Sequence, residues 1–77
     1  MRLPPDSRRS VIITAALRVA RDRGLVHVNH STVADRCVTQ TSPKTVKHYF
    51  SSRRDLWVVV RDAAPDEFEK QAKELGL

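Results

Sequence analysis

A cluster of hydrogen-bonding residues occupies positions 42–50, which read S-P-K-T-V-K-H-Y-F. Ser42 and Pro43 are typical of a helix start, because the hydroxyl accepts from a free backbone N–H and proline needs no N–H there. Val46 and Phe50 are four residues apart and form one apolar stripe. The donor-bearing residues outside that stripe are Lys44, Thr45, Lys47 and His48.

This pattern predicts a short helix with a narrow apolar stripe and a donor-rich outer face. Such a helix suits insertion into the DNA major groove, where base edges present both acceptors and donors. A solvated helix face that carries lysines by chance gives the same pattern. Residues 42–50 alone do not distinguish the two interpretations.

Catalytic and metal-binding patterns are missing from the sequence. No nucleophile, base and orienting acid stand at suggestive positions, and there is no glycine-rich phosphate loop. His27 and His30 are interpreted as surface residues of a loop, since no cysteine or carboxylate completes a metal site. Cys37 is interpreted as a small core residue. We therefore predict no enzymatic activity, no metal site and no cofactor.

The charge of the chain is high and unevenly distributed. The net charge is +5 and the pI is about 10.2. Residues 1–62 contribute +7, with twelve Lys or Arg against five Asp or Glu, and residues 63–77 contribute −2, with two against four. A basic body with a mildly acidic tail favours a polyanionic partner for the body. Plain solubility is the alternative explanation.

Length and composition predict one small domain in the cytoplasm. A chain of 77 residues is near the lower limit for a compact core, so three or more helices must share it. No apolar run approaches a membrane span, and the N-terminus lacks the apolar core of a signal peptide. The single cysteine excludes an internal disulfide and fits a reducing compartment. We expect a cytoplasmic, nucleoid-associated protein with no membrane contact.

The first helix is predicted to follow an extended arm over residues 1–5. It is capped by Asp6 or Ser7, runs to Arg23 and stops at Gly24, a residue typical of the position after a helix C-terminus. Its apolar stripe consists of Ile12, Ile13, Ala16, Leu17 and Ala20, with Val19 on the edge. Two cations, Arg8 and Arg9, lie in its first turn, where the helix dipole disfavours them. Phosphate contacts would offset that cost; a solvated pair is the alternative.

The remaining elements follow from capping residues and breaks. Residues 25–28 form an apolar connector, Asn29 caps a second helix, and residues 38–41 form the turn before the central helix. The buried face of the second helix consists of Val33, Ala34 and Cys37. Ser52 and Asp55 resemble a capping box for a fourth helix that starts at the intervening Arg53. Its core positions are Leu56, Trp57 and Val60.

Pro65 interrupts the helical pattern and predicts a break before a separate amphipathic helix. The apolar stripe of that helix consists of Phe68, Ala72 and Leu75. The stripe either folds back on the core or forms a homodimer contact with a second copy. The predicted fold is thus all-α, with a three-helix helix-turn-helix core, a fourth helix and a short C-terminal helix. We divide the chain into a DNA-binding domain over residues 1–64 and a C-terminal helix over residues 65–77.

Over residues 8–62 the chain resembles the DNA-binding domain of the TetR-type transcriptional repressors. The letters I-I-T-A-A-L, followed seven residues later by Gly24, are similar to the family's I-L-x-A-A-x-x-x-F-x-x-x-G. Val33 and Ala34 match its Ile-Ala pair in spacing. The pattern S-x-x-T-V-x-x-Y-F matches S-x-G-T-L-Y-x-H-F, and S-R-R-D-L from Ser52 matches S-K-x-x-L. The last two motifs, adjacent and correctly spaced, are the most specific.

Several positions depart from the family pattern. Ala20 stands where the family usually has Phe, and Val28 where it has Thr. Lys44 stands in place of a Gly, and Lys47 in place of a Tyr. The turn over residues 38–41 is four residues long and lacks glycine, where the family has two residues that include one. The family's C-terminal ligand-binding domain has no counterpart after the fourth helix. We therefore expect no small-molecule inducer for this chain.

The resemblance implies a role for each matching residue. Ser42, Thr45, Tyr49 and Arg53 would contact phosphates, whereas Lys44 and His48 would face base edges. Tyr49 is equally explained as a half-buried ring with a solvated hydroxyl. The full set of predicted DNA-binding residues is Arg8, Arg9, Ser42, Lys44, Thr45, Lys47, His48, Tyr49, Arg53 and Arg54.

The sequence thus predicts a double-stranded DNA-binding transcriptional regulator, a repressor without a ligand-sensing domain. The alternative is a protein-interaction module whose basic helix and acidic tail bind a host protein such as a polymerase. A third interpretation is a nonspecific nucleoid-type binder. The three differ in sequence preference and in the salt dependence of DNA binding.

Overall fold

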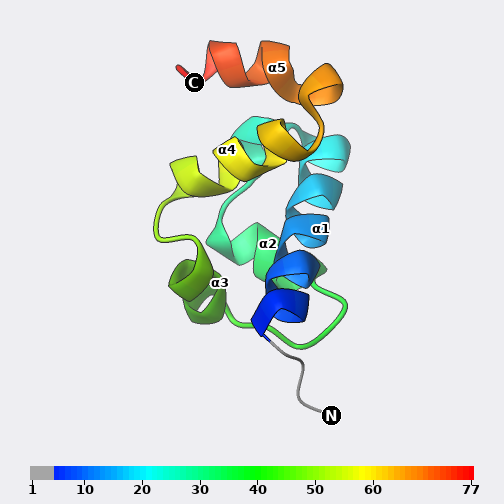
Figure 1. Cartoon of the computed structure of the whole chain (residues 1–77), viewed down its shortest axis with the longest axis vertical. Helices are drawn as coiled ribbons and strands as arrows, with labels where there is room; N and C mark the ends of the chain where they lie inside the picture. Colours follow the sequence, from blue (N-terminus) through cyan, green and yellow to red (C-terminus); the bar gives the residue numbers. More distant parts are fainter. Residues whose placement is uncertain (1–4) are drawn as a thin grey trace.

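Five α-helices and one short 3-10 helix make up the computed structural model, which describes residues 5–77 (Figure 1). In chain order they are α1 (Pro5–Arg23), η1 (Leu25–His27), α2 (His30–Arg36), α3 (Pro43–Tyr49), α4 (Arg53–Ala63) and α5 (Pro65–Glu74). The described residues contain no strand, so the predicted all-α class is confirmed. The break predicted at Pro65 is the boundary between α4 and α5.

Three helices begin at the capping residues that the sequence predicted. Asn29, Ser42 and Ser52 each accept a hydrogen bond from the backbone N–H three residues later, at 3.0, 3.2 and 3.1 Å. At Ser52 the box is reciprocal, because the Asp55 carboxylate accepts from the Ser52 backbone N–H at 3.3 Å. These bonds satisfy N–H groups that the first turn of a helix leaves unpaired. The starts of α2, α3 and α4 are therefore fixed by local chemistry.

The first helix begins earlier than predicted. α1 starts at Pro5, so neither Asp6 nor Ser7 stands before it as a cap. The reason is that the fixed φ of proline fits a first helical turn and its missing N–H costs nothing there. The rest of the predicted arm lies outside the described residues. At the other end α1 stops as predicted before Gly24, whose φ of 99° disfavours any residue with a side chain.

One hydrophobic core is shared by all five α-helices and the connector. Its buried members are Ile12, Ala15, Ala16, Val19, Ala20, Leu25, Val28, Val33, Ala34, Val46, Phe50, Leu56, Val60, Phe68 and Ala72. In α1 the predicted stripe is shifted, because the helix contacts both α2 and α4. As a result Ala15 and Val19 are buried, whereas Ile13 and Leu17 are only half-buried.

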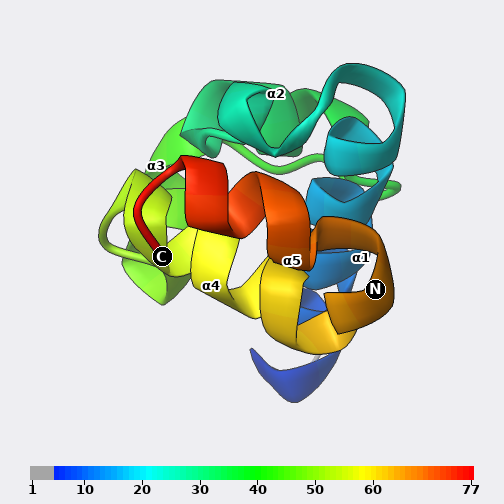
Figure 2. The ribbon, with the colours of Figure 1, turned by 90° about the horizontal axis from the view of Figure 1, so that it is seen from above.

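α5 runs alongside α4 and contributes to the same core (Figure 2). Phe68 is 2% exposed and Ala72 is 1% exposed, while Leu75 packs against them at the edge. The Gln71 side-chain oxygen also accepts from the backbone N–H of Leu25 at 2.7 Å, which ties α5 to η1. Of the two arrangements left open by the sequence, the stripe has thus folded back on the core. A homodimer contact through Phe68 and Ala72 would first have to expose them.

An ion pair holds α5 against the end of α1. Arg21 donates two hydrogen bonds to the Glu67 carboxylate, both at 2.9 Å. Both side chains are about half exposed, so the pair orients α5 more than it stabilises it. The apolar contacts of Phe68 and Ala72 therefore supply most of the stabilising energy at this junction.

Replacing Phe68 with Ala should lower the free energy of unfolding by about 3–5 kcal/mol, because a large buried ring leaves a cavity. Urea unfolding followed by circular dichroism at several protein concentrations measures the loss. Lys70→Ala, on the exposed side of α5, is the matched control and should change little. A loss that depends on protein concentration would show instead that Phe68 acts across a dimer contact.

Candidate nucleic-acid interface

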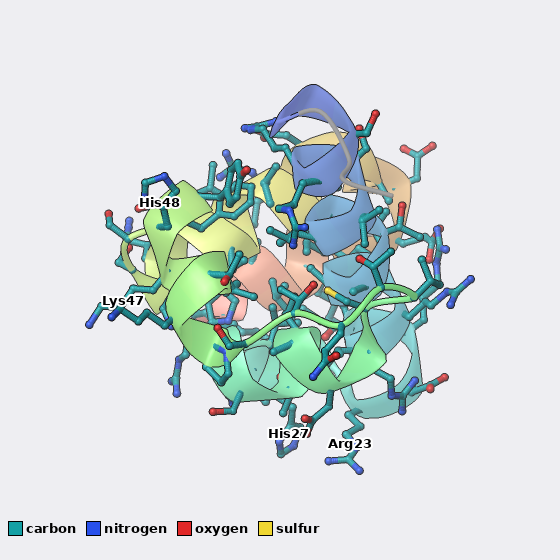
Figure 3. All side chains as sticks on the ribbon, turned by 90° about the horizontal axis from the view of Figure 1, so that it is seen from below. Arg23, His27, Lys47 and His48 are labelled. Atoms are coloured by element: carbon teal, nitrogen blue, oxygen red, sulfur yellow. The ribbon has the colours of Figure 1, made fainter. Side chains whose placement is uncertain are left out.

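α3 is attached to the core along one edge and exposes the rest of its surface. Val46 and Phe50 are buried, as predicted from their spacing. Lys44, Lys47 and His48 are exposed. Figure 3 shows Lys47 and His48 projecting from α3 away from the core, with Arg23 and His27 at another edge of the molecule. The outward direction predicted for Lys44, Lys47 and His48 is thus confirmed, whereas Thr45 is half-buried and its hydroxyl lies against the Ser42 hydroxyl.

A shallow hollow of about 490 Å³ brings α1 and α3 together. Its lining residues are Arg8 from α1 and Lys44, Thr45, His48 and Tyr49 from α3. Among the described residues no carboxylate lines it, and all five of these side chains can donate a hydrogen bond. The Tyr49 ring is half-buried and meets His48 edge to face, with 5.4 Å between ring centroids. The hollow is therefore a cationic, donor-rich surface suited to an anion.

Two further predicted residues hold their guanidinium groups over aromatic rings. The Arg53 guanidinium carbon lies 4.7 Å from the centroid of the Trp57 ring. That of Arg9 lies 5.1 Å from the centroid of the Phe50 ring. A guanidinium over a ring face is attracted by the ring quadrupole while its N–H edges still reach outward. Arg9 thereby extends the cationic surface to the end of α3.

The remaining predicted residues already have partners within the chain. The Ser42 hydroxyl caps α3 and lies 3.1 Å from the Thr45 hydroxyl. Arg54 donates to the backbone carbonyl of Gly76 at 3.2 Å, so part of its guanidinium holds the C-terminal end of the chain. Both side chains are nevertheless exposed. No local sequence pattern indicates the contact between Arg54 and Gly76, because it joins residues 22 positions apart.

Two hydrogen bonds join residues far apart in the sequence: one fixes the end of α3, and the other ties α4 to the connector before α2. The His30 Nε2 donates to the Phe50 carbonyl at 2.7 Å, which requires a proton on that nitrogen. The Trp57 Nε1–H donates to the Val28 carbonyl at 3.0 Å. The interpretation of His30 as a plain surface residue was therefore wrong, because its half-buried ring joins α2 to α3. Nothing in the local sequence signals this contact.

The segment between α2 and α3 contains the lengthened turn. Cys37 is half-buried, and its thiol donates to the Val33 carbonyl at 3.3 Å. Burial raises the pKa of this thiol, so it stays protonated and unreactive at neutral pH. Val38, which follows it, is 71% exposed. It borders a groove of about 160 Å³ against the outer face of α1, lined mainly by apolar atoms.

No protein-family model, curated protein or solved structure matches the chain. Among residues 5–77, no group of three or more His, Cys, Asp or Glu side chains is placed to hold a metal ion. None of the helices in this part of the chain has both the length and the apolar character needed to cross a membrane. The candidate site therefore rests on its own geometry.

Asp55 lies in the first turn of α4, beside Arg53 and Arg54, and its ionised carboxylate accepts the hydrogen bonds that cap this helix. Hydrogen bonds from the Ser51 hydroxyl, at 3.0 Å, and from the Ser52 backbone N–H lower the pKa of the Asp55 carboxyl below its ordinary value of 3.8. A lowered pKa in the folded state means that the ionised form stabilises the fold. That contribution is present above pH 3.8 and disappears as the pH falls through the folded-state pKa.

Replacing Asp55 with Asn should lower the free energy of unfolding at pH 7, because the amide keeps an acceptor but loses the charge. The difference from the wild-type protein should shrink as the pH falls below about 4. Urea unfolding between pH 7 and pH 3 measures it. Ser51→Ala removes the hydroxyl that donates to the Asp55 carboxylate. The free energy of unfolding of this variant should therefore depend less on pH than that of the wild-type protein. A difference that stays constant with pH would contradict the assigned ionised role.

Proposed function

We propose that the chain is a double-stranded DNA-binding transcriptional regulator that represses by occupying a promoter, with α3 as the helix that enters the major groove. The observation that carries the proposal is the hollow in which Arg8 of α1 joins Lys44, Thr45, His48 and Tyr49 of α3, with no carboxylate among its described lining residues. A surface of this charge, on a protruding two-turn helix, fits a groove whose walls are phosphates.

The roles of the residues follow from their positions. Lys44 and His48 are exposed on α3 and would donate to base edges, for which guanine O6 and N7 are good acceptors. Thr45, Tyr49 and Lys47 would contact phosphates along the groove. The other proposed phosphate contacts are Arg8, Arg9, Ser42, Arg53 and Arg54. For the residues of α3 and for Ser42 and Arg53, this division is the one that the resemblance to the TetR-type repressors implies.

A second candidate function is docking on a protein partner. The observation that favours it is Val38, which is 71% exposed beside the apolar groove. Val11 and Ala15 of α1 contribute apolar side chains to the lining of that groove, and Arg18 and Arg36 contribute charged ones. A single exposed valine is ordinary on a protein surface, but this one adjoins an apolar groove, and contiguous apolar patches mark interaction surfaces. This surface does not include the α3 side chains, so the two functions are separable by mutation.

Lys44→Ala should change the base preference of the protein, whereas Arg53→Ala should weaken binding to all sequences alike. Selection from a randomised duplex pool at about 0.15 M salt, followed by sequencing, measures the first effect. Titration of one duplex at several salt concentrations measures the second. Each phosphate contact that is removed should reduce the slope of log K against log salt by about 1. Lys70→Ala is the matched control: it removes an exposed lysine of α5, outside the proposed interface, and should leave DNA binding almost unchanged.

The outcomes of the selection separate the candidates. An enriched palindrome indicates two copies on the DNA, and a single short motif indicates a monomeric reader. Retention without any motif indicates a nonspecific binder. No retention at this salt concentration contradicts the DNA-binding proposal and favours the protein partner. In that case Val38→Ser would be the variant that tests the second candidate.

A further inference from the structure

The two arginines that lie over aromatic rings differ from the other cations of the candidate interface. Arg53 and Trp57 are four residues apart on α4, so their side chains are neighbours on one helix face. Arg9 comes from α1, and its partner Phe50 ends α3, so this contact spans two elements. In both cases an exposed guanidinium lies on a ring that the core holds in place.

The Trp57 ring is fixed independently of Arg53. It packs against the hydrophobic core, and its Nε1–H donates to the Val28 carbonyl, which belongs to a fully buried residue. Phe50 is likewise buried, and its backbone carbonyl accepts from His30. Both rings are therefore rigid supports, whereas a free arginine side chain samples many rotamers.

We infer that Trp57 is a positioning residue, which holds the Arg53 guanidinium in the orientation that a DNA phosphate requires. This inference rests on the proposed function and adds to it a residue that would not itself contact DNA. Stacking over the ring leaves the planar N–H edges of the guanidinium free to donate to phosphate oxygens. Because the side chain is already ordered, less conformational entropy is lost on binding. The contact of Arg9 with Phe50 is a second instance of the arrangement.

Arg54 provides the contrast within the same turn of α4. Its guanidinium donates to the Gly76 carbonyl and lies over no described ring. Part of its donor set is thus used inside the chain. Changes at Trp57 should therefore affect Arg53 and leave Arg54 as it is. The two neighbouring arginines give an internal control for every measurement.

Two substitutions separate the ring from its hydrogen bond. Trp57→Phe keeps an aromatic face but loses the donor to Val28, whereas Trp57→Leu loses both. With a random-sequence DNA duplex at about 0.05 M salt, Trp57→Leu should weaken binding about three- to tenfold, the effect expected for one unordered arginine. Trp57→Phe should retain most of the affinity. Equal losses in the two variants would overturn the positioning role, since the hydrogen bond would then explain both.

A double-mutant cycle distinguishes positioning from a general loss of structure. In an Arg53→Ala background, Trp57→Leu should weaken duplex binding no further, because there is no guanidinium left to orient. The same loss with and without Arg53 would overturn the inference. Arg53→Lys, which leaves the core untouched, should also weaken binding, because an ammonium keeps the charge but not the planar stack. Wild-type affinity in Arg53→Lys would count against it too.

A measurement without DNA tests the ordering of Arg53 by Trp57 separately from the proposed function. NMR relaxation of the Arg53 Nε–H group in the free protein should report restricted motion that is lost in Trp57→Leu and kept in Trp57→Phe. The Arg54 Nε–H group, in the same spectra, should not change. An Arg53 group equally mobile in all three proteins would refute the positioning role. Failure of the wild-type protein to bind any duplex would refute the DNA-binding proposal while leaving this result intact.

Discussion

A chain of 77 residues can bury only enough apolar surface for one small core, and this limit governs the rest of the structure. Every helix has to contribute, so α5 adds Phe68 and Ala72 to the core instead of presenting them outward. Within its own bounds α3 contributes one buried residue, Val46, and the adjoining Phe50 is buried as well. The basic side chains Lys44, Lys47 and His48 stay exposed on the rest of this helix, and the candidate interface lies there.

So short a helix as α3 needs external support. A seven-residue helix is far below the length at which isolated helices are stable in water, so its order depends on its ends and its packing. The hydroxyl of Ser42 caps one end, and the imidazole of His30 donates to the Phe50 carbonyl at the other. These contacts set the rotation of α3 about its axis. They thereby determine which side chains share the hollow with Arg8.

The sequence predicted the local features well and the distant ones poorly, for physical reasons. Caps such as Ser52 and the glycine stop after α1 act within a few residues, so their residue types reveal them. The contact between His30 and Phe50 and that between Arg9 and Phe50 join residues 20 and 41 positions apart, and depend on how helices are placed. For the same reason the sequence did not determine where the apolar stripe of α5 packs, since its pattern suits a contact with the core or with a second copy. The residues of the candidate site were predicted; the rings that support its arginines were not.

The arrangement of the helices also separates charge along the molecule. Its extents are 39 × 20 × 19 Å, with α5 at one end of the long axis and α3 with the start of α1 toward the other (Figure 1). The acidic residues of α5 thus lie far from the cationic hollow, and one of them, Glu67, is neutralised by Arg21. At physiological salt, charges separated by more than about 8 Å are largely screened from one another. The acidic end therefore does not cancel the basic end, and a polyanion that approaches the molecule would be attracted to the end that carries α3.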